Sequence, residues 1–321
     1  DYAVDAYLEY GTVSGMYTNT IPTFNNTANI PDEILLSNLM PDTRYYYRMQ
    51  YRPVGSSTFT PTDEYSFHTQ RAAGSPFTFT IEADEHLYDK KGVQNMYRVT
   101  LNNESLDRPD FMLSLGDIFG DDHTPTTTTL ANMDSLHKAY RPFLGTICNS
   151  VPFYVCLGNH EGESDFNLGN TPPNNIGVYG TLTRKKYYPN PEPNAFYTGD
   201  TISENFGINR PANYYSWTWG DALFVVLDNY WHSPALVDSG FGPKAKDSKG
   251  DDKKNRDWWG ITIGDAQYQW LKRTLETSKA KHKFVFAHHV LGSGRGGVDE
   301  ADLYEWGGQG KKGEEIGRAH V

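Results

Sequence analysis

Hydrophobic and polar residues alternate in two different ways along the chain, and the change falls near residue 71. Before that point, short apolar runs are separated by clusters of Pro, Gly, Ser, Asn and Thr, a pattern typical of strands joined by turns. In the phrase LMPDTRYYY, alternation predicts that Tyr45 and Tyr47 share one face of a strand that follows a Pro-containing turn. Residues 1–70 therefore predict an all-β domain. The strands expected in it are 6–10, 33–39, 44–51 and 65–69.

From residue 76 onward, strand-like runs alternate with helical patterns, which favours an α/β layered domain. Residues 71–75, with sequence RAAGS, indicate a linker between the two domains. The last helical pattern has Asp265 as its expected N-cap. The expected strands are 77–81, 111–115, 151–157, 214–219, 223–227 and 283–288, and the expected helices are 92–106, 130–144 and 265–279.

Two polar segments, 162–201 and 241–259, are longer than ordinary connections between elements. We expect them to be insertions that wall a functional site. The second contains the charge run 244–254, which favours a solvated loop.

The composition predicts a globular protein of about two domains, because the 321 residues are 37% hydrophobic and 14% aromatic. A net charge of −11 argues against general binding to nucleic acids or anionic membranes. No apolar run is long enough to predict a membrane span. Cys148 and Cys156 fit two buried thiols, with a disulfide as the alternative, so they do not fix the cellular compartment.

Polar side chains at the ends of four predicted strands carry the candidate chemistry. Open α/β sheets place their sites at such strand ends. Asp, His and Asn together offer the oxygen and imidazole ligands that suit two ions such as Mn, Fe or Zn. The polar residues at any one strand end also fit a structural role, but four such groups in this order are unlike a coincidence. The residues at these ends are Asp84, His86, Asp117, Asn159, His160 and His288.

These strings resemble the calcineurin-like metallophosphoesterases, in particular the purple-acid-phosphatase-like branch with an N-terminal fibronectin-type sandwich. The resemblance covers nearly the whole chain and includes the phrases RPDF, YYPNP and QYQWL. It implies that residues 1–70 are part of a fibronectin type III-like β-sandwich. It further implies that residues 76–314 form an incomplete metallophosphoesterase domain, a β-sandwich flanked by helices.

The resemblance implies two divalent or trivalent metal ions and a role for each strand-end residue. Asp84 and His86 would bind the first metal, Asn159 and His288 the second, and Asp117 would bridge the two. A metal-bound hydroxide would then attack the phosphorus of a small phosphate ester.

The resemblance also implies the remaining catalytic roles. His160 would not be a ligand but would be the general acid or would stabilise the developing charge. Asp121 or Asp122 would orient His160 or support the metal ligands. Apart from the resemblance, Arg295 in the glycine-rich loop 292–297 and His289 are candidate contacts for the phosphate. The resemblance implies a secreted or periplasmic phosphoesterase, and the competing hypothesis is a degenerate fold that serves binding or adhesion.

Two features depart from the nearest patterns. True purple acid phosphatases carry a Tyr three residues after the bridging Asp and lack the His of the first motif, whereas this chain has Gly120 and His86. We therefore do not expect the Tyr–iron colour. Residues 292–297 match the dinucleotide pattern G-x-G-x-x-G, but a lone match is weak, and a flexible loop at the active site is the better interpretation.

The family's last metal motif, Gly-His-x-His, is not found in the sequence. The codons GAG-ATC-GGA-AGA-GCA-CAC-GTC encode residues 315–321 and match a common sequencing adapter. We therefore expect these residues to be translated adapter, with a natural polar tail as the alternative, and we do not count His320 as a ligand. On this interpretation the chain is a fragment that is cut at both ends, and we expect the fragment by itself to be inactive because it lacks the last metal ligands.

Overall fold

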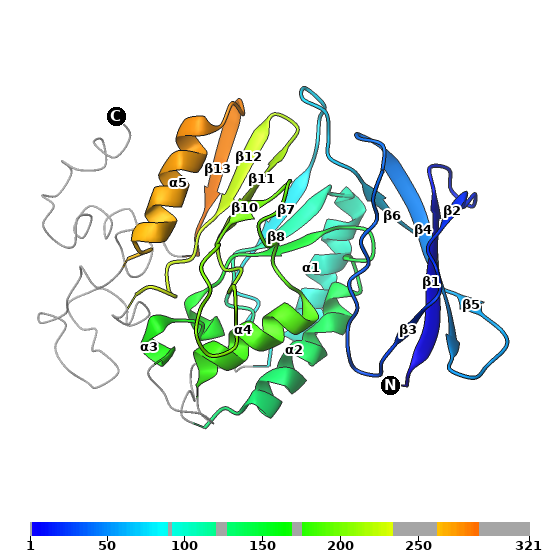
Figure 1. The fold of residues 1–321 in the computed structure, drawn as a ribbon, viewed down its shortest axis with the longest axis horizontal. Coiled ribbons are helices and arrows are strands. Elements are labelled where there is room, and N and C mark those ends of the chain that lie inside the picture. Colours follow the sequence, from blue (N-terminus) through cyan, green and yellow to red (C-terminus); the bar gives the residue numbers. More distant parts are fainter. Residues whose placement is uncertain (1, 89–91, 120–126, 169–174, 234–261, 289–321) are drawn as a thin grey trace, which may run out of the picture.

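The computed structural model describes residues 2–88, 92–119, 127–168, 175–233 and 262–288. An N-terminal β-sheet lies beside a larger unit in which helices surround two further sheets (Figure 1). The change in hydrophobic pattern near residue 71 therefore falls between the N-terminal sheet and the two further sheets.

The N-terminal strands form one antiparallel sheet in the order β2-β1-β4-β5, with β3 paired to β1 and β6 paired to β4. This sheet contains three of the four expected strands together with short ones that the pattern did not reveal. Its strands are β1 (Val4–Gly11), β2 (Asn19–Thr20), β3 (Phe24–Asn26), β4 (Arg44–Pro53), β5 (Thr60–Pro61) and β6 (Tyr65–His68).

The two faces of this sheet differ in chemistry. Tyr45 and Tyr47 both pack against Phe67, with ring centroids 5.5 and 6.0 Å away, so the predicted shared face is confirmed. On the opposite face Arg52 pairs with Asp5 at 3.1 Å across β1 and β4. Within the described residues these strands make a single sheet, and the sandwich stays a prediction.

The strand expected at 33–39 is wrong, because this segment forms neither a strand nor a helix. Leu35 in its middle is 90% exposed. A strand is stabilised by hydrogen bonds to a neighbour, and within the described part of the chain this segment has none. Its apolar content alone gave a misleading signal.

The larger unit contains two sheets that pack face to face. The parallel sheet has the order β7-β8-β9 and the mixed sheet the order β10-β11-β12-β13. Phe111 of the first sheet contacts Trp217 and Phe224 of the second, with ring centroids 5.4 and 5.0 Å apart. The strands are β7 (Phe79–Glu82), β8 (Phe111–Ser114), β9 (Phe153–Val155), β10 (Thr198–Gly199), β11 (Tyr215–Trp219), β12 (Ala222–Val226) and β13 (His282–Phe286).

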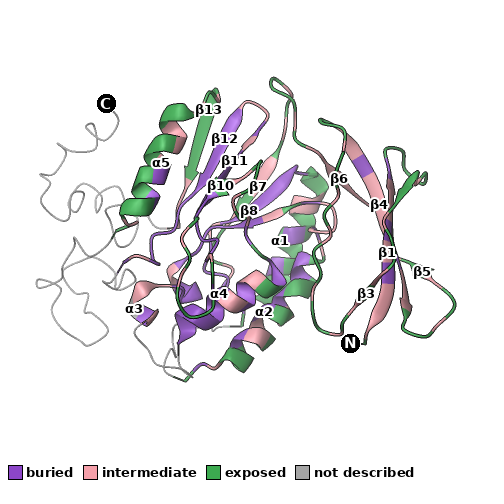
Figure 2. Ribbon diagram, viewed as in Figure 1, coloured by how far each residue is buried: buried purple, intermediate pink, exposed green. Residues whose placement is uncertain are grey.

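Helices cover the outer faces of this sandwich. Tyr140 of α2 belongs to the apolar cluster that backs the parallel sheet, and Trp270 of α5 packs on Tyr214 beside the mixed sheet. The central strands are buried while β13 is mostly exposed (Figure 2). The helices are α1 (Gln94–Asp107), α2 (Leu130–Leu144), α3 (Asp165–Leu168), α4 (Ile176–Tyr187) and α5 (Asp265–Thr277).

Two expectations about helices need correction. The N-cap of α5 is Gly264, and Asp265 lies in the first turn, where a carboxylate still faces the positive end of the helix. The segment 162–201 is not simply a polar insertion, because it contains α3 and the largely buried α4. The segment 241–259 lies outside the described residues.

Both cysteines are free thiols, as the first interpretation of the sequence has it. Cys156 is buried and Cys148 is partly buried. In the described parts of the chain, no helix combines the length and apolar character needed to cross a bilayer.

Candidate metal centre

The loops after β7 and β8 run side by side beyond the ends of the strands. The backbone N–H of Asp84 donates to the carbonyl of Gly116 at 2.9 Å, and that of His86 donates to the carbonyl of Asp117 at 3.0 Å. Asp84, His86 and Asp117 have φ of 60°, 45° and 61°, in the left-handed region that non-glycine residues seldom adopt. Such strain is typical of functional sites.

Left-handed backbone, rather than simple strand alternation, brings Asp84 and His86 together. The Nε2 atom of His86 lies 3.8 Å from Oδ1 of Asp84. Strand β7 has already ended at Glu82, so the alternation expected to continue through this string does not apply. The two side chains nevertheless meet, as the sequence interpretation requires.

The carboxylate of Asp117 lies at the centre of the candidate ligands. Its Oδ2 atom is 3.2 Å from Nε2 of His288, 3.7 Å from Nε2 of His86 and 3.9 Å from Nε2 of His160. Two groups therefore have ligating atoms within 4.8 Å of one another, and Asp117 belongs to both. The groups are His86, Asp117 and His160, and Asp84, Asp117 and His288.

Asn159 begins the short 3-10 helix η2 (Asn159–Glu161) directly after Gly158. Its Nδ2 atom is buried, and within the described residues no acceptor lies within hydrogen-bond distance of it. A buried amide is costly without partners, so its position needs a reason. The amide oxygen at the other end of this side chain, like the Asp and His donors of the centre, is of a type that fits a borderline-soft cation.

His160 is buried and lies next to Asp117 in two ways. Its backbone N–H donates to Oδ1 of Asp117 at 2.9 Å, and its ring lies 5.1 Å from the ring of His86. Its Nε2 atom is also close enough to join a ligand group. Distances alone therefore accommodate His160 either as a ligand or as a proton donor beside the ions.

The charges of the centre are strongly coupled. Burial disfavours the imidazolium of His288, but the hydrogen bond and charge of Asp117 outweigh it and raise the pKa of His288 to about 9. Burial raises the pKa of Asp117, and the contacts with His288 and His160 outweigh that effect and lower it. Without cations, a proton on His288 thus balances the carboxylate.

Two buried carboxylates beside the centre were not singled out by the sequence. Glu161 ends η2, and burial followed by the charge of Asp117 raises its pKa to about 8. Glu163 forms a buried bidentate pair with Arg184 of α4, at 2.8 and 2.9 Å. Their signal is the Glu-Gly-Glu that directly follows His160. Asp121, Asp122, His289 and Arg295 lie outside the described residues.

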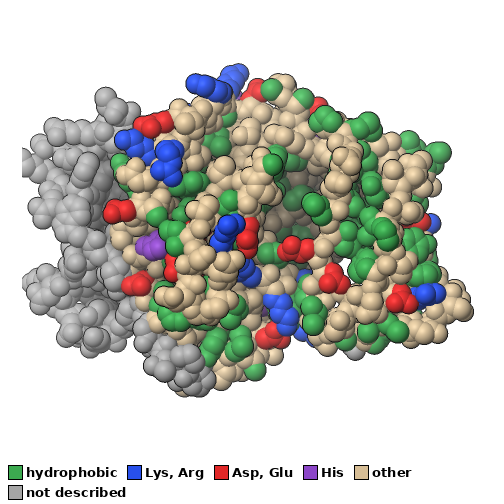
Figure 3. All heavy atoms as spheres, viewed as in Figure 1, with side chains coloured by type: hydrophobic (Ala, Val, Ile, Leu, Met, Phe, Trp, Pro, Cys, Tyr) green, Lys and Arg blue, Asp and Glu red, His purple; other side chains and the backbone are tan. Residues whose placement is uncertain are grey.

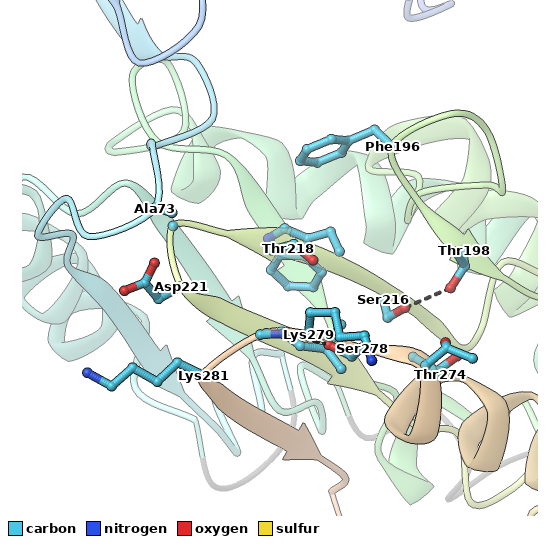
Figure 4. A pocket seen from close by; sticks show the side chains of 15 residues that line it. Ala73, Phe196, Thr198, Ser216, Thr218, Asp221, Thr274, Ser278, Lys279 and Lys281 are labelled. Carbon is cyan, nitrogen blue, oxygen red and sulfur yellow. Dashed lines mark hydrogen bonds between the residues drawn. The ribbon is translucent and has the colours of Figure 1, made fainter.

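Two hollows formed by described residues lie away from the candidate ligands. A groove of about 610 Å³ lies where α5 ends beside β11 and β12, and Thr198, Ser216 and Lys281 are among its lining residues (Figure 4). Another hollow, of about 740 Å³, lies between the N-terminal sheet and the helices α2 and α4. On the face in Figure 3, basic and acidic side chains are interspersed.

Comparisons with known proteins agree with this geometry. The sequence model of the family described as calcineurin-like phosphoesterase matches residues 77–307. Among solved structures, the chain is similar to purple acid phosphatase PPD1 from yellow lupin (Lupinus luteus) seeds, with a TM-score of 0.53 and 14% identity. The match covers 98% of this chain and 50% of the lupin chain, so this chain spans about half the length of that enzyme. No curated protein matches the sequence.

Proposed function

Because the chain belongs to the calcineurin-like phosphoesterase family, we propose that it hydrolyses phosphate esters at a centre of two metal ions. The observation that supports this most is the carboxylate of Asp117, which is common to both groups of candidate ligands. A carboxylate shared in this way can bridge two cations and lower their repulsion. The proposed ligands are Asp84, His86, Asp117, Asn159 and His288.

Bound cations would neutralise the charge of the phosphoryl group and lower the pKa of coordinated water. The chain's own residues would supply the rest. Asp117 holds the two ligand groups together, and His160 donates a proton to the leaving alkoxide. His160 suits that role because its backbone N–H anchors it to Asp117, which holds its imidazole beside the proposed ligands. Asp122, His289 and Arg295 stay proposed contacts in the same reaction.

Two further predictions accompany this proposal. The hydroxyl of Tyr45 accepts the backbone N–H of Met40 at 2.9 Å, a contact similar to the tyrosine corner of immunoglobulin-like sandwiches. This supports a fibronectin-type origin for the N-terminal sheet. A secreted or periplasmic location is the second prediction, and it follows only from the resemblance.

The test uses the full-length protein loaded with Mn²⁺ or Zn²⁺ and two chromogenic substrates, p-nitrophenyl phosphate and bis(p-nitrophenyl) phosphate. We expect turnover of at least one of them, loss of turnover with EDTA, and recovery when the metal is returned. The ratio of the two rates would assign monoester or diester preference. Tight binding of metal and phosphate without turnover would instead indicate a degenerate binding module. Failure to bind any transition metal would refute the proposed centre.

A further inference from the structure

The side chain of Glu161 connects both loops that carry the central ligands. Its Oε2 atom accepts the backbone N–H groups of Gly158 at 2.5 Å and Asp117 at 3.0 Å. Its Oε1 atom accepts the N–H of Ile118 at 2.7 Å. The residue is only 5% exposed, so water does not compete with these three bonds. One carboxylate therefore satisfies three backbone donors from two distant parts of the sequence.

The two loops lie unusually close where Glu161 joins them. A Cβ atom on Gly158 would lie 2.2 Å from Oδ1 of Asp117, and one on Gly116 would lie 2.3 Å from the nitrogen of Gly158. In the opposite direction, the N–H of His160 donates to Oδ1 of Asp117 at 2.9 Å. The carboxylates of Asp117 and Glu161 thus each accept backbone N–H groups from the loop that carries the other.

From this arrangement we infer that Glu161 is a positioning residue that sets the separation between the two metal positions. It fixes the backbone of Asp117, which has a left-handed φ of 61°, against the turn that carries Asn159 and His160. The inference rests on the proposed function, because it assumes that Asp117 bridges two ions. Glu161 itself binds no metal in this scheme and acts only through the ligands that it holds.

A carboxylate is specifically suited to this role. When it is ionised, both of its oxygens accept hydrogen bonds and neither carries a hydrogen, so it can satisfy three converging N–H groups. In Glu161→Gln, one of the two positions becomes an NH₂ group that faces N–H donors and cannot accept from them. In Glu161→Asp both acceptors remain, but the side chain is one methylene shorter and cannot reach all three donors at once.

The experiment compares wild type, Glu161→Gln and Glu161→Asp after loading with Mn²⁺. Bound metal is counted by elemental analysis, and electron paramagnetic resonance distinguishes a coupled pair of Mn²⁺ ions from isolated ions. Glu104→Gln is the matched control. Glu104 lies on α1, away from the ligands, and accepts a hydrogen bond from the hydroxyl of Thr80 at 2.6 Å. Circular dichroism and thermal unfolding show whether each variant is folded.

We expect wild type and Glu104→Gln to hold a coupled pair. Glu161→Gln should remain folded, lose the coupled signal and bind its second ion at least 10-fold more weakly. The coupled signal and the affinity for the second ion in Glu161→Asp should lie between those of wild type and Glu161→Gln. Two ions with wild-type coupling in folded Glu161→Gln would overturn the inference. If that variant does not fold, wild-type coupling in Glu161→Asp would overturn it equally.

Unfolding of both variants would assign Glu161 to folding rather than to positioning and would also refute the inference. Failure of the proposed function is recognised separately, because the wild-type protein itself would then bind fewer than two ions. Only when wild type holds the coupled pair does the comparison of variants decide the role of Glu161.

Discussion

Asp117 and His160 are neighbours in space, but in the proposed mechanism Asp117 binds the metal ions and His160 does not. Asp117→Ala removes the carboxylate common to both ligand groups, so we expect loss of bound metal together with activity. His160→Ala removes a proton donor, so we expect it to retain metal while the rate falls about 10²–10⁴-fold, the usual range for a general acid. Elemental analysis and initial rates on the same preparations test both.

The two variants also decide a question that distances alone leave open. The Nε2 atom of His160 is 3.9 Å from Oδ2 of Asp117 and could face a metal. If His160→Ala loses as much metal as Asp117→Ala, then His160 is a ligand and another residue must supply the proton. His232→Ala is a suitable control, since His232 lies after β12 and belongs to neither ligand group of the described residues.

His137 should make stability depend on pH independently of the metal centre. It is buried in α2, where its ring stacks on Tyr188 and its Nδ1 atom lies 2.6 Å from the Tyr188 hydroxyl. Burial, and then the charge of Arg184, lower its pKa from 6.5 to about 3. The folded state therefore holds His137 neutral, while the unfolded chain takes up a proton below pH 6.5. Stability present above pH 6.5 is lost as the pH falls towards 3.

The measurement is urea unfolding of wild type and His137→Gln between pH 4.5 and 7.5. The contributions of titratable groups that both proteins share cancel in the difference between their free energies of unfolding. We expect the advantage of wild type to shrink by about 1.4 kcal/mol for each pH unit below 6.5. A difference that stays constant with pH would mean that His137 is protonated in the folded protein.

At the scale of elements, the sequence was informative where a segment has one clear apolar face. Helix α2 has the predicted bounds, because its buried residues Met133, His137 and Tyr140 recur at helical spacing. Helix α4 was missed because it is buried on most sides, so its sequence shows no polar stripe. The segment 33–39 was misassigned for the opposite reason, since it is apolar but has no partner strand among the described residues.

The candidate site was more predictable than the fold around it. Polar residues at strand ends could be found from the sequence, and the structure brings Asp84, His86, Asp117 and His288 together. The role of Glu161 could not be found in this way, because it depends on backbone donors of a loop that is distant in sequence. A one-dimensional pattern records side chains and contains no information about which backbone groups they meet.

The turn after β8 provides a test of how loop geometry creates the site. Gly116 has φ of 94°, and a Cβ there would lie 2.3 Å from the nitrogen of Gly158. Gly116→Ala should force the two ligand loops apart, lower the free energy of unfolding by about 2 kcal/mol or more, and release metal. Thermal unfolding and elemental analysis would measure the two effects.

Gly145→Ala is the control for this substitution. Gly145 caps α2 with φ of −58°, and an added Cβ would meet its nearest atoms at 3.5 Å, an ordinary contact. We expect this variant to keep both stability and metal. Retention of metal by Gly116→Ala, at the level of Gly145→Ala, would show that the loops tolerate separation and that their close approach does not determine the site.

At the scale of the whole molecule, the segment that follows the N-terminal sheet makes polar contacts with the α/β unit. Arg71 pairs with the buried Asp110 at 2.7 Å, and the N–H of Gly74 donates to Asp221 at 2.7 Å. Gln70 donates to the carbonyl of Thr218 at 3.0 Å. These contacts fall on both sheets of the larger unit, which favours unfolding of the two units together.

Tyr47 offers the clearest test of that coupling. Its hydroxyl donates to the carbonyl of Asn149 at 2.6 Å across the boundary, and burial raises its pKa to about 12. Tyr47→Phe keeps the ring packing and leaves that carbonyl without its donor, so we expect a loss of about 1 kcal/mol in the free energy of unfolding. Tyr46→Phe is the control, because alternation along β4 directs Tyr46 to the opposite face of the sheet.

If the units unfold together, urea unfolding of Tyr47→Phe followed by fluorescence and by circular dichroism should give one transition, shifted equally for both probes. Two transitions in wild type, of which only the less stable moves in Tyr47→Phe, would show instead that the sheet and the α/β unit unfold independently.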